Sequence, residues 1–178
     1  MGKEEYAIIL DYLPQGYPLE KKMMPIDQAI GPVNLTLLEL VPRRGESLEI
    51  GEKVYIGEDK RDKIYYILGR LNREKITESA KGELQEFLAT VISENEAKFL
   101  EFFNKSEAIN KRMHQIELLP GFGKKHMQEI LKARKEKLFD GFKDMKNRIQ
   151  NLPDPGKAVE KRIFQELVEM ERYKLFVR

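Results

Sequence analysis

The sequence predicts an α+β protein in which strands and helices are segregated along the chain. A small β-barrel is expected in residues 1–75 and an all-α region in residues 105–178, with a helical connector over residues 76–104. Two observations predict this division. Short apolar runs between turn signals fill the first region, which is typical of strands. From Thr77 onward, apolar residues recur at steps of three and four, which is typical of amphipathic helices.

Four runs in the first region are predicted to form strands. The first run ends at Pro14-Gln15-Gly16, a turn signal. The last two runs flank a charged turn, so we expect them to pair as a hairpin. Short strands with apolar residues on both faces favour a small closed or half-closed barrel, OB-like or, as the alternative, SH3-like. The four runs are residues 6–13, 33–41, 53–56 and 63–68.

The connector combines an apolar helical face with an acidic charge. Residues 76–104 hold 2 Lys/Arg against 6 Asp/Glu. We therefore expect this segment to pack against its neighbours and to make no contact with nucleic acid. Its apolar face consists of Leu84, Phe87, Leu88, Val91 and Ile92.

Positive charge is concentrated at the start of the helical region, although the formal net charge of the whole chain is only +2. Residues 105–137 hold 9 Lys/Arg against 4 Asp/Glu, whereas residues 1–75 hold 12 against 13. A local excess of cations favours an anionic partner. A solvated helix face would give the same excess, and this alternative stays open.

A glycine-rich loop at residues 119–123 (LPGFG) is expected to join two helices, the first of which covers residues 107–118. Leu119 can anchor the loop in the core, and Pro120 cannot continue the first helix. The two glycines of the loop permit backbone conformations that are closed to other residues, and they let a phosphate group approach closely.

The second helix would offer free N–H groups and the positive end of its dipole to that phosphate. Lys124 and Lys125 fall in its first turn, where a cation opposes the helix dipole. An anionic partner explains lysines at this place better than helix stability does. The candidate nucleic-acid-binding residues are Pro120, Gly121, Phe122, Gly123, Lys124, Lys125 and His126.

The same pattern recurs 33 residues later, where residues 149–157 (IQNLPDPGK) align with residues 116–124 (IELLPGFGK). Two such hairpins in tandem would bury their apolar faces against each other in one compact helical unit. In the second copy, Asp154 and Pro155 stand where the first copy has Gly121 and Phe122. Because a carboxylate would repel phosphate, we expect the second hairpin to be degenerate and structural.

The loop and the basic start of the following helix resemble the helix-hairpin-helix motif of DNA repair and replication proteins. The resemblance extends over residues 107–135 and 140–172, and it implies binding of the nucleic-acid backbone without sequence readout. The whole chain also resembles an archaeal family known as domain of unknown function 655, through residues 7–13, 25–42 and 50–57 and the loop. That likeness implies an OB-like region beside a tandem helix-hairpin-helix region, with RNA favoured as the ligand and DNA as the alternative.

A second basic set lies in the barrel region. Tyr55, Tyr65 and Tyr66 could stack on bases, or they could be packing residues of a pleated sheet. Successive side chains of a strand point to opposite faces, so one residue of the adjacent pair should be exposed. The candidate secondary nucleic-acid-binding residues are Arg43, Arg44, Lys60, Arg61, Tyr65 and Arg70.

Composition limits the remaining functions. The chain has no Cys, and its histidines, His114 and His126, match no zinc-ligand spacing, so we expect no metal and no cofactor. No apolar run approaches the roughly 18 to 20 residues of a membrane-spanning helix, so we expect no membrane contact. The absence of Cys fits a reducing compartment, so we expect a cytoplasmic location.

We expect a nucleic-acid-binding protein that is not an enzyme. A helix-hairpin-helix glycosylase is the main enzymatic alternative, because Asp140 and Asp144 follow the hairpin. The helices that remain are too few to build a base pocket as well. The alternative outside catalysis is a protein-interaction or scaffold module of a ribonucleoprotein or repair complex.

Overall fold

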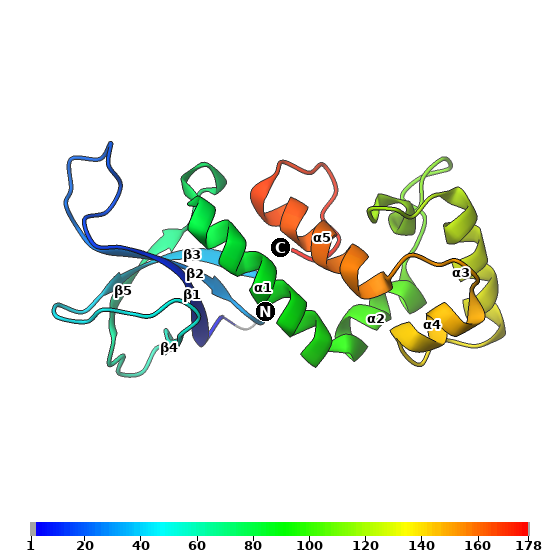
Figure 1. The fold of residues 1–178 in the computed structure, drawn as a ribbon, viewed down its shortest axis with the longest axis horizontal. Helices are drawn as coiled ribbons and strands as arrows, with labels where there is room; N and C mark the ends of the chain where they lie inside the picture. The colour runs from blue at the N-terminus through cyan, green and yellow to red at the C-terminus, as the bar shows by residue number, and fades with distance from the viewer. Residues whose placement is uncertain (1–2, 178) are drawn as a thin grey trace. The chain divides into compact units, whose positions relative to one another are not determined.

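The computed structural model describes residues 3–177, and within them it confirms the α+β class. The strands form one antiparallel sheet that curls into a half-barrel, in the order β4-β1-β2-β3-β5. All strands precede the α-helices along the chain (Figure 1). The strands are β1 (Tyr6–Leu13), β2 (Ile26–Gly31), β3 (Thr36–Pro42), β4 (Lys53–Tyr55) and β5 (Ile64–Arg70).

Strand β2 is absent from the sequence prediction. Its sequence, IDQAIG, shows no polar–apolar alternation, because all six residues are buried. The buried amide of Gln28 is satisfied by the chain that follows the sheet: its Nε2 donates to the Lys75 carbonyl at 2.7 Å, and its Oε1 accepts the Thr77 N–H at 3.1 Å. A polar residue in the sheet therefore marks a tertiary hydrogen bond here and not a turn.

The bounds of β1 are confirmed, and the strand predicted over residues 33–41 begins later than expected. Leu35 has a φ of +55°, in the left-handed region, so the chain turns there. Strand β3 starts at Thr36, immediately after this turn.

The predicted hairpin of the last two strands is wrong. β4 pairs with β1, where Ala7 faces Val54. β5 pairs with β3, where Val41 faces Tyr66. The two strands therefore lie at opposite edges of the sheet, and the wide loop between them bonds to itself, since the Arg61 Nε donates to the Gly57 carbonyl at 2.7 Å.

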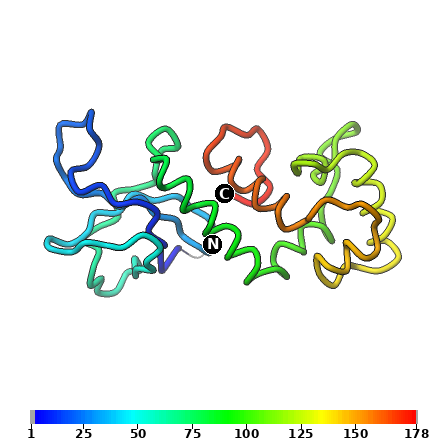
Figure 2. Tube along the Cα trace, in the orientation of Figure 1, coloured from blue at the N-terminus to red at the C-terminus, as the bar shows by residue number. Residues whose placement is uncertain are grey.

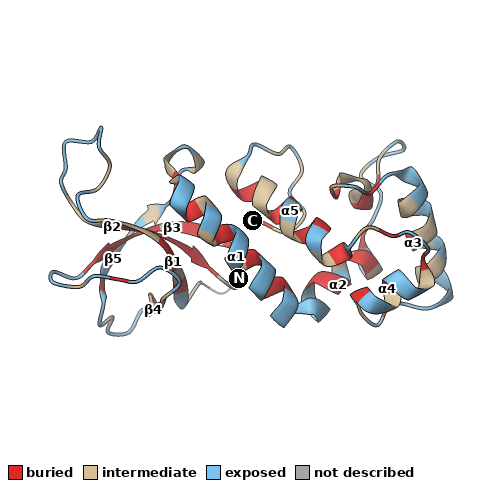
Figure 3. Ribbon diagram, viewed as in Figure 1, coloured by how far each residue is buried: buried red, intermediate tan, exposed pale blue. Residues whose placement is uncertain are grey.

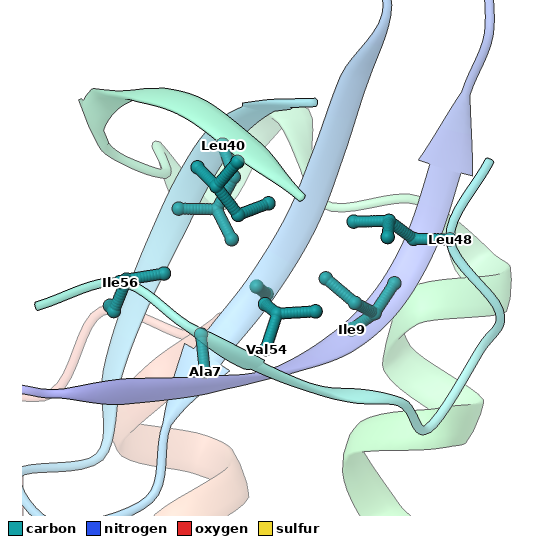
Figure 4. Close-up of a cluster of buried hydrophobic side chains, with 8 residues drawn as sticks. Ala7, Ile9, Leu40, Leu48, Val54 and Ile56 are labelled. Atoms are coloured by element: carbon teal, nitrogen blue, oxygen red, sulfur yellow. The ribbon is translucent and has the colours of Figure 1, made fainter. Parts of the chain in front are cut away.

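The inner face of the curled sheet holds one apolar cluster. Figure 4 shows Ala7, Ile9 and Val54 pointing toward Leu40 from neighbouring strands. Burial of one Leu or Ile side chain stabilises a fold by about 1.5–3 kcal/mol, so this cluster is what maintains the curl. Its members are Ala7, Ile9, Ala29, Leu40, Leu48, Val54, Ile56 and Ile64.

One carboxylate interrupts this apolar interior. Asp27 is 0% exposed, and neither of its side-chain oxygens has a hydrogen-bond partner among the described residues. Burial, reinforced by the nearby charges of Glu52 and Asp11, raises the pKa of Asp27 to about 7.

From residue 77 onward the chain is mainly helical, as expected. The hydroxyl of Thr77 accepts the Ala80 N–H at 3.0 Å and so caps the first helix. No helix among residues 3–177 is long and apolar enough to cross a membrane. The α-helices are α1 (Glu78–Glu94), α2 (Glu96–Lys105), α3 (Lys124–Glu136), α4 (Phe142–Arg148) and α5 (Pro155–Val168), and the 3-10 helices are η1 (Arg73–Lys75) and η2 (Gln115–Leu118).

The chain forms two compact units, and each is considered by itself. Unit 1 consists of Met1–Phe87 with Glu166–Arg178, and unit 2 of Leu88–Gln165. These units cut across the predicted segments, because α1 and α5 each contribute residues to both. In unit 1, the loop between β1 and β2 stands away from the sheet (Figure 2). In unit 2, much of the surface of α3 is exposed (Figure 3).

The buried Asp27 predicts a pH-dependent stability. The unfolded carboxyl ionises from about pH 4 upward, whereas the folded one keeps its proton until about pH 7. The contribution of the Asp27 carboxyl to the free energy of unfolding is therefore most favourable below its unfolded pKa, and it is lost as the pH rises to the folded pKa. We expect Asp27→Asn to raise the free energy of unfolding by roughly 2–4 kcal/mol at pH 8 and by little at pH 4.

Urea unfolding at the two pH values measures this difference. The control is Asp62→Asn, which removes the same charge from an exposed position of the same unit. An Asp27→Asn gain that is equal at both pH values would contradict the role given to the buried carboxyl.

Candidate nucleic-acid interface

The first loop (residues 119–123) is fixed by two buried side chains on either side of its first glycine. Leu119 is 2% exposed and Phe122 is 5% exposed. The Phe122 ring lies 6.0 Å from the Phe103 ring, between centroids, and the Phe122 N–H donates to the Leu119 carbonyl at 3.0 Å. The anchor role predicted for Leu119 is confirmed. The side chain of Phe122, one of the candidate nucleic-acid-binding residues, is buried as well, and it positions the loop.

Gly121 has the conformation for which a glycine was expected. Its φ is +83°, in the left-handed region. A Cβ at this position would lie 3.9 Å from the Pro153 side chain, so the first loop lies beside the second loop (residues 149–154). Glycine is needed here for the backbone rather than for space.

Gly123 does not have the special backbone conformation that was expected of it. Its φ of −106° and ψ of −168° are extended values that other residues adopt. A Cβ there would meet no atom within 4 Å. Gly123 instead serves as the N-cap of α3, since its carbonyl accepts the Met127 N–H at 3.0 Å.

The N-terminus of α3 is open. No side chain caps it, and its first turn contains no acidic residue. Lys125 is exposed and has no ion pair or hydrogen bond among the described residues. Lys124 is also exposed, with its Nζ donating to the Arg112 carbonyl at 3.1 Å and lying 3.7 Å from Glu117 Oε1. Free amides, the helix dipole and two cations therefore meet at one place.

Two further candidates flank this turn. Pro120 is half-buried in the first loop, and His126 is half-buried with its ring 5.8 Å from the Phe122 ring, between centroids. The structure thus brings together all seven predicted residues of the first loop and α3. Of these seven side chains, that of Phe122 is buried in the core of unit 2.

The second loop ends in a different helix start. Asp154 accepts the Lys157 N–H on Oδ1 at 3.1 Å, and Pro155 is the first residue of α5. The carboxylate of Asp154 also lies 3.8 Å from Lys146 Nζ. This N-terminus is therefore capped from within the chain, in contrast to the open N-terminus of α3.

The helix predicted over residues 107–118 is wrong. The segment folds back on itself, with a bridge between Ala108 and His114 and a hydrogen bond from the Ile109 N–H to the Met113 carbonyl. Only η2 is helical in it. The buried His114 decides this local structure, because its Nδ1 accepts the Ile116 N–H at 3.2 Å. Burial, followed by the nearby charge of Arg134, lowers the pKa of His114.

This folded-back segment carries two cations that the sequence argument missed. Lys111 and Arg112 are exposed at its turn, and the Arg112 carbonyl is the acceptor of the Lys124 Nζ. The adjacent Lys-Arg pair is a sequence signal for a cationic surface. The predicted helix over residues 107–118 gave this pair no special position, whereas the observed turn exposes both side chains.

Two arginines hold the frame behind the loop. Arg134 of α3 donates to the carbonyls of Phe103 and Ser106 at 3.0 and 2.7 Å. Arg148 of α4 donates to the Ala133 carbonyl at 2.6 Å. Both guanidinium groups therefore form hydrogen bonds within unit 2. These bonds fix the orientation of α3 through the C-terminal half of the helix.

The secondary candidates of the barrel separate into groups. Arg43, Arg44 and Tyr65 line one cavity of about 540 Å³, and Tyr65 is 63% exposed. Arg61 and Arg70 line a larger cavity of about 1170 Å³, and Lys60, which is exposed, lines neither. The expectation that one tyrosine of the pair Tyr65 and Tyr66 is exposed is confirmed.

Metal ligands do not gather at the interface. Among residues 3–177, no three His, Cys, Asp or Glu side chains form a group that could hold a metal ion. The chemistry present is that of amides and ammonium groups, which suits phosphate oxygens.

Comparison with known proteins shows what the chain is similar to. A family model described as "Protein of unknown function (DUF655)" matches residues 3–178. The uncharacterized protein MJ0038 of Methanocaldococcus jannaschii is 40% identical over 177 residues, which are 98% of this chain and 80% of the relative. The crystal structure of Af1531 from Archaeoglobus fulgidus, of the same family model, has a TM-score of 0.84 and 39% identity over 98% of this chain and 100% of its own.

The two loop glycines predict opposite responses to one substitution. Gly121→Ser forces a side chain into the left-handed region and should cost about 1–2 kcal/mol. Gly123→Ser places a capping hydroxyl on an extended residue with open space around it, so stability should stay constant or rise slightly. Urea unfolding followed by circular dichroism compares the two variants. Equal losses would mean that the backbone of the first loop is not as described.

Proposed function

The chain belongs to the family described as "Protein of unknown function (DUF655)", and from its structure we propose that it binds nucleic acid by the phosphate backbone. The binding element is residues 119–125, the first loop with the start of α3. RNA is the favoured ligand, and DNA is the alternative. We propose a binding protein and not an enzyme, located in the cytoplasm.

One observation carries the proposal: the two related helix starts differ in the way that phosphate binding requires. Asp154 fills the N-terminus of α5 with a carboxylate. Gly123 leaves the N-terminus of α3 open, with Lys124 and Lys125 in the first turn. A helix start without a cap leaves amides unpaired in the protein, and lysines there oppose the dipole. A bound phosphate group would satisfy both.

The charge around this helix start supports the same ligand. Residues 105–137 hold 9 Lys/Arg against 4 Asp/Glu. The exposed Lys111 and Arg112 extend the cationic surface beside Lys124. Because amides and lysines contact phosphate oxygens and not base edges, binding should be nearly independent of sequence.

The finer fold assignments belong to the same proposal. We assign the two loops of unit 2 to a tandem helix-hairpin-helix arrangement with a degenerate second copy, supported by the position of Gly121 beside Pro153. We assign the sheet of unit 1 to an OB-like half-barrel, supported by five strands curled around one apolar cluster. Arg43, Arg44 and Tyr65 around one cavity would be its contribution to binding.

A protein-interaction function is the second candidate, and one observation favours it. The loop between β1 and β2 carries Leu19 and Met23, which are 99% and 75% exposed. Large apolar side chains that protrude from a loop are suited to a partner surface. If this function is correct, substitutions at the basic start of α3 would not affect binding of the protein partner.

Removing the lysines of the α3 start should weaken binding without unfolding the protein. Lys124→Ala with Lys125→Ala should cost about 1 kcal/mol or more of binding free energy. The slope of log affinity against log salt should become shallower by about 0.7 per lost contact on single strands and about 0.9 on duplex. Fluorescence anisotropy with labelled RNA and duplex DNA at several salt concentrations measures both.

The matched control changes the corresponding helix of the second copy. Lys157→Ala with Lys161→Ala removes the same charge from exposed positions of α5 and should leave affinity nearly unchanged. A loss in this control and not in the α3 variant would assign binding to the second copy. No loss in either variant would favour the protein-interaction function.

A carboxylate at the α3 N-cap should separate binding from stability. Gly123→Asp copies the cap of α5 onto α3 and should keep or slightly raise the melting temperature. It should nevertheless abolish most binding, because the carboxylate occupies the amides and repels phosphate. Gly123→Asn caps the same amides without charge and should lose less. Retained affinity in Gly123→Asp would contradict the proposed site.

A further inference from the structure

A small cavity of unit 1 lies where the end of β5, the start of β3 and the C-terminal segment meet. Its volume is about 220 Å³, below the roughly 300–1,000 Å³ of pockets for drug-sized ligands. The cavity therefore suits a small group. Its wall includes Leu35, whose φ of +55° is rare for a branched residue.

Three cations line this cavity: Arg70, Arg73 and Lys174. None of them has an ion pair or a hydrogen bond from its charged group among the described residues. The Nη1 of Arg73 is buried and has no acceptor among the described residues, so the charge of this guanidinium is not neutralised within that part of the chain. An anionic ligand in the cavity would offset the positive charge of the three side chains.

The one carboxylate of the cavity wall is already engaged. Glu166 is 2% exposed, and its Oε1 accepts the N–H groups of Leu175, Phe176 and Val177 at 2.9, 3.0 and 3.1 Å. These bonds hold the C-terminal segment, and with it Lys174, at the cavity. Glu166 thus builds the cationic site and leaves it an excess of positive charge.

The larger cavity of the same unit has a different charge balance. Its Lys3 pairs with Glu58 at 3.1 Å, and its Arg61 donates to the Gly57 carbonyl at 2.7 Å. Glu4 accepts the Val33 N–H at 3.1 Å. Arg70 lines both cavities, but the wall of the larger one also holds four carboxylates, Glu4, Glu5, Glu58 and Asp59, which would repel an anion. The smaller cavity is therefore the better candidate.

We propose that the cavity of Arg70, Arg73 and Lys174 binds a phosphate group. Two guanidinium groups and an ammonium group match the oxygens and the charge of a phosphate dianion. The site lies in unit 1, whereas the loop and helix start proposed for nucleic acid lie in unit 2. It does not depend on that function.

The phosphate group has two possible sources. It is either a free phosphate or phosphomonoester, or the terminal phosphate of a nucleic-acid strand. A phosphodiester within a strand fits less well, because it carries one negative charge, whereas a terminal phosphate group carries up to two and matches three cations better.

Titration of the full chain with inorganic phosphate at constant ionic strength, with chloride as the competing anion, tests the site by isothermal calorimetry. Arg73→Met with Lys174→Met should weaken phosphate binding about tenfold or more. The control, Lys21→Met with Lys22→Met, removes the same charge from exposed positions of the same unit and should bind as the unchanged protein does. Melting temperatures verify that both variants are folded.

Two results would overturn the proposal. One is phosphate binding that does not saturate in the unchanged protein, and the other is an equal loss in both double variants, which would indicate a general charge effect.

A second comparison identifies the source of the phosphate group. If the ligand is a strand end, a 5′-phosphorylated oligonucleotide should bind more tightly than its 5′-hydroxyl counterpart, and Arg73→Met with Lys174→Met should remove that difference. Equal binding of the two oligonucleotides assigns the site to free phosphate or a phosphomonoester.

Discussion

The shape of the candidate interface in unit 2 depends on the burial of Phe122 against Phe103. This contact, together with the buried Leu119, fixes the first loop at both ends and forces the turn at Gly121 between them. A loop held by two apolar anchors loses little conformational entropy when it binds, so its backbone is organised before a ligand arrives. The direction in which α3 begins, and therefore the place of its open amides, follows from these anchors. The guanidinium of Arg134 holds the same helix from behind.

The two loops have similar sequences, but the helix starts that follow them differ in their chemistry. Both loops pass from an apolar anchor through a proline to a helix, and they lie side by side at Gly121 and Pro153. In the second loop a carboxylate supplies the missing acceptor, so α5 is satisfied by its own chain. In the first loop the cap is a glycine, and the acceptor must come from water or a ligand. One copy can therefore serve the fold while the other stays free for binding, a division that needs few substitutions.

Much of the fold could be predicted from local pattern, and the errors have physical reasons. β1, α1 and α3 follow from apolar runs and periodicity, most clearly α1, which buries Ala80, Leu84, Leu88 and Val91 on one face. β2 was missed because all six of its residues are buried and show no polar–apolar alternation. A hydrogen bond to the chain that follows the sheet accounts for the buried Gln28, whereas the buried Asp27 has no such partner among the described residues. The apolar residues of 107–118 have a helical period, but the hydrogen bond of His114 with the Ile116 N–H stabilises a non-helical turn before η2. The pairing of β4 with β1 joins distant segments, which no local pattern reports. The candidate loop is predicted from its glycines, whereas the approach of Arg112 to Lys124 depends on the folded-back segment and could not be predicted from the sequence.

The central claim is that the amides at the start of α3, and not those of α5, receive the phosphate group of a nucleic acid. Titration of the isotope-labelled chain with a short single-stranded RNA, followed by amide NMR shifts, tests it most directly. We expect the largest shifts at Gly123, Lys124 and Lys125, in positions where the structure gives the amides no side-chain cap. The amides of Gly156 and Lys157 should change little, because Asp154 already accepts from that turn. Shifts confined to the start of α5, or absent from both helix starts while RNA binds, would contradict the account.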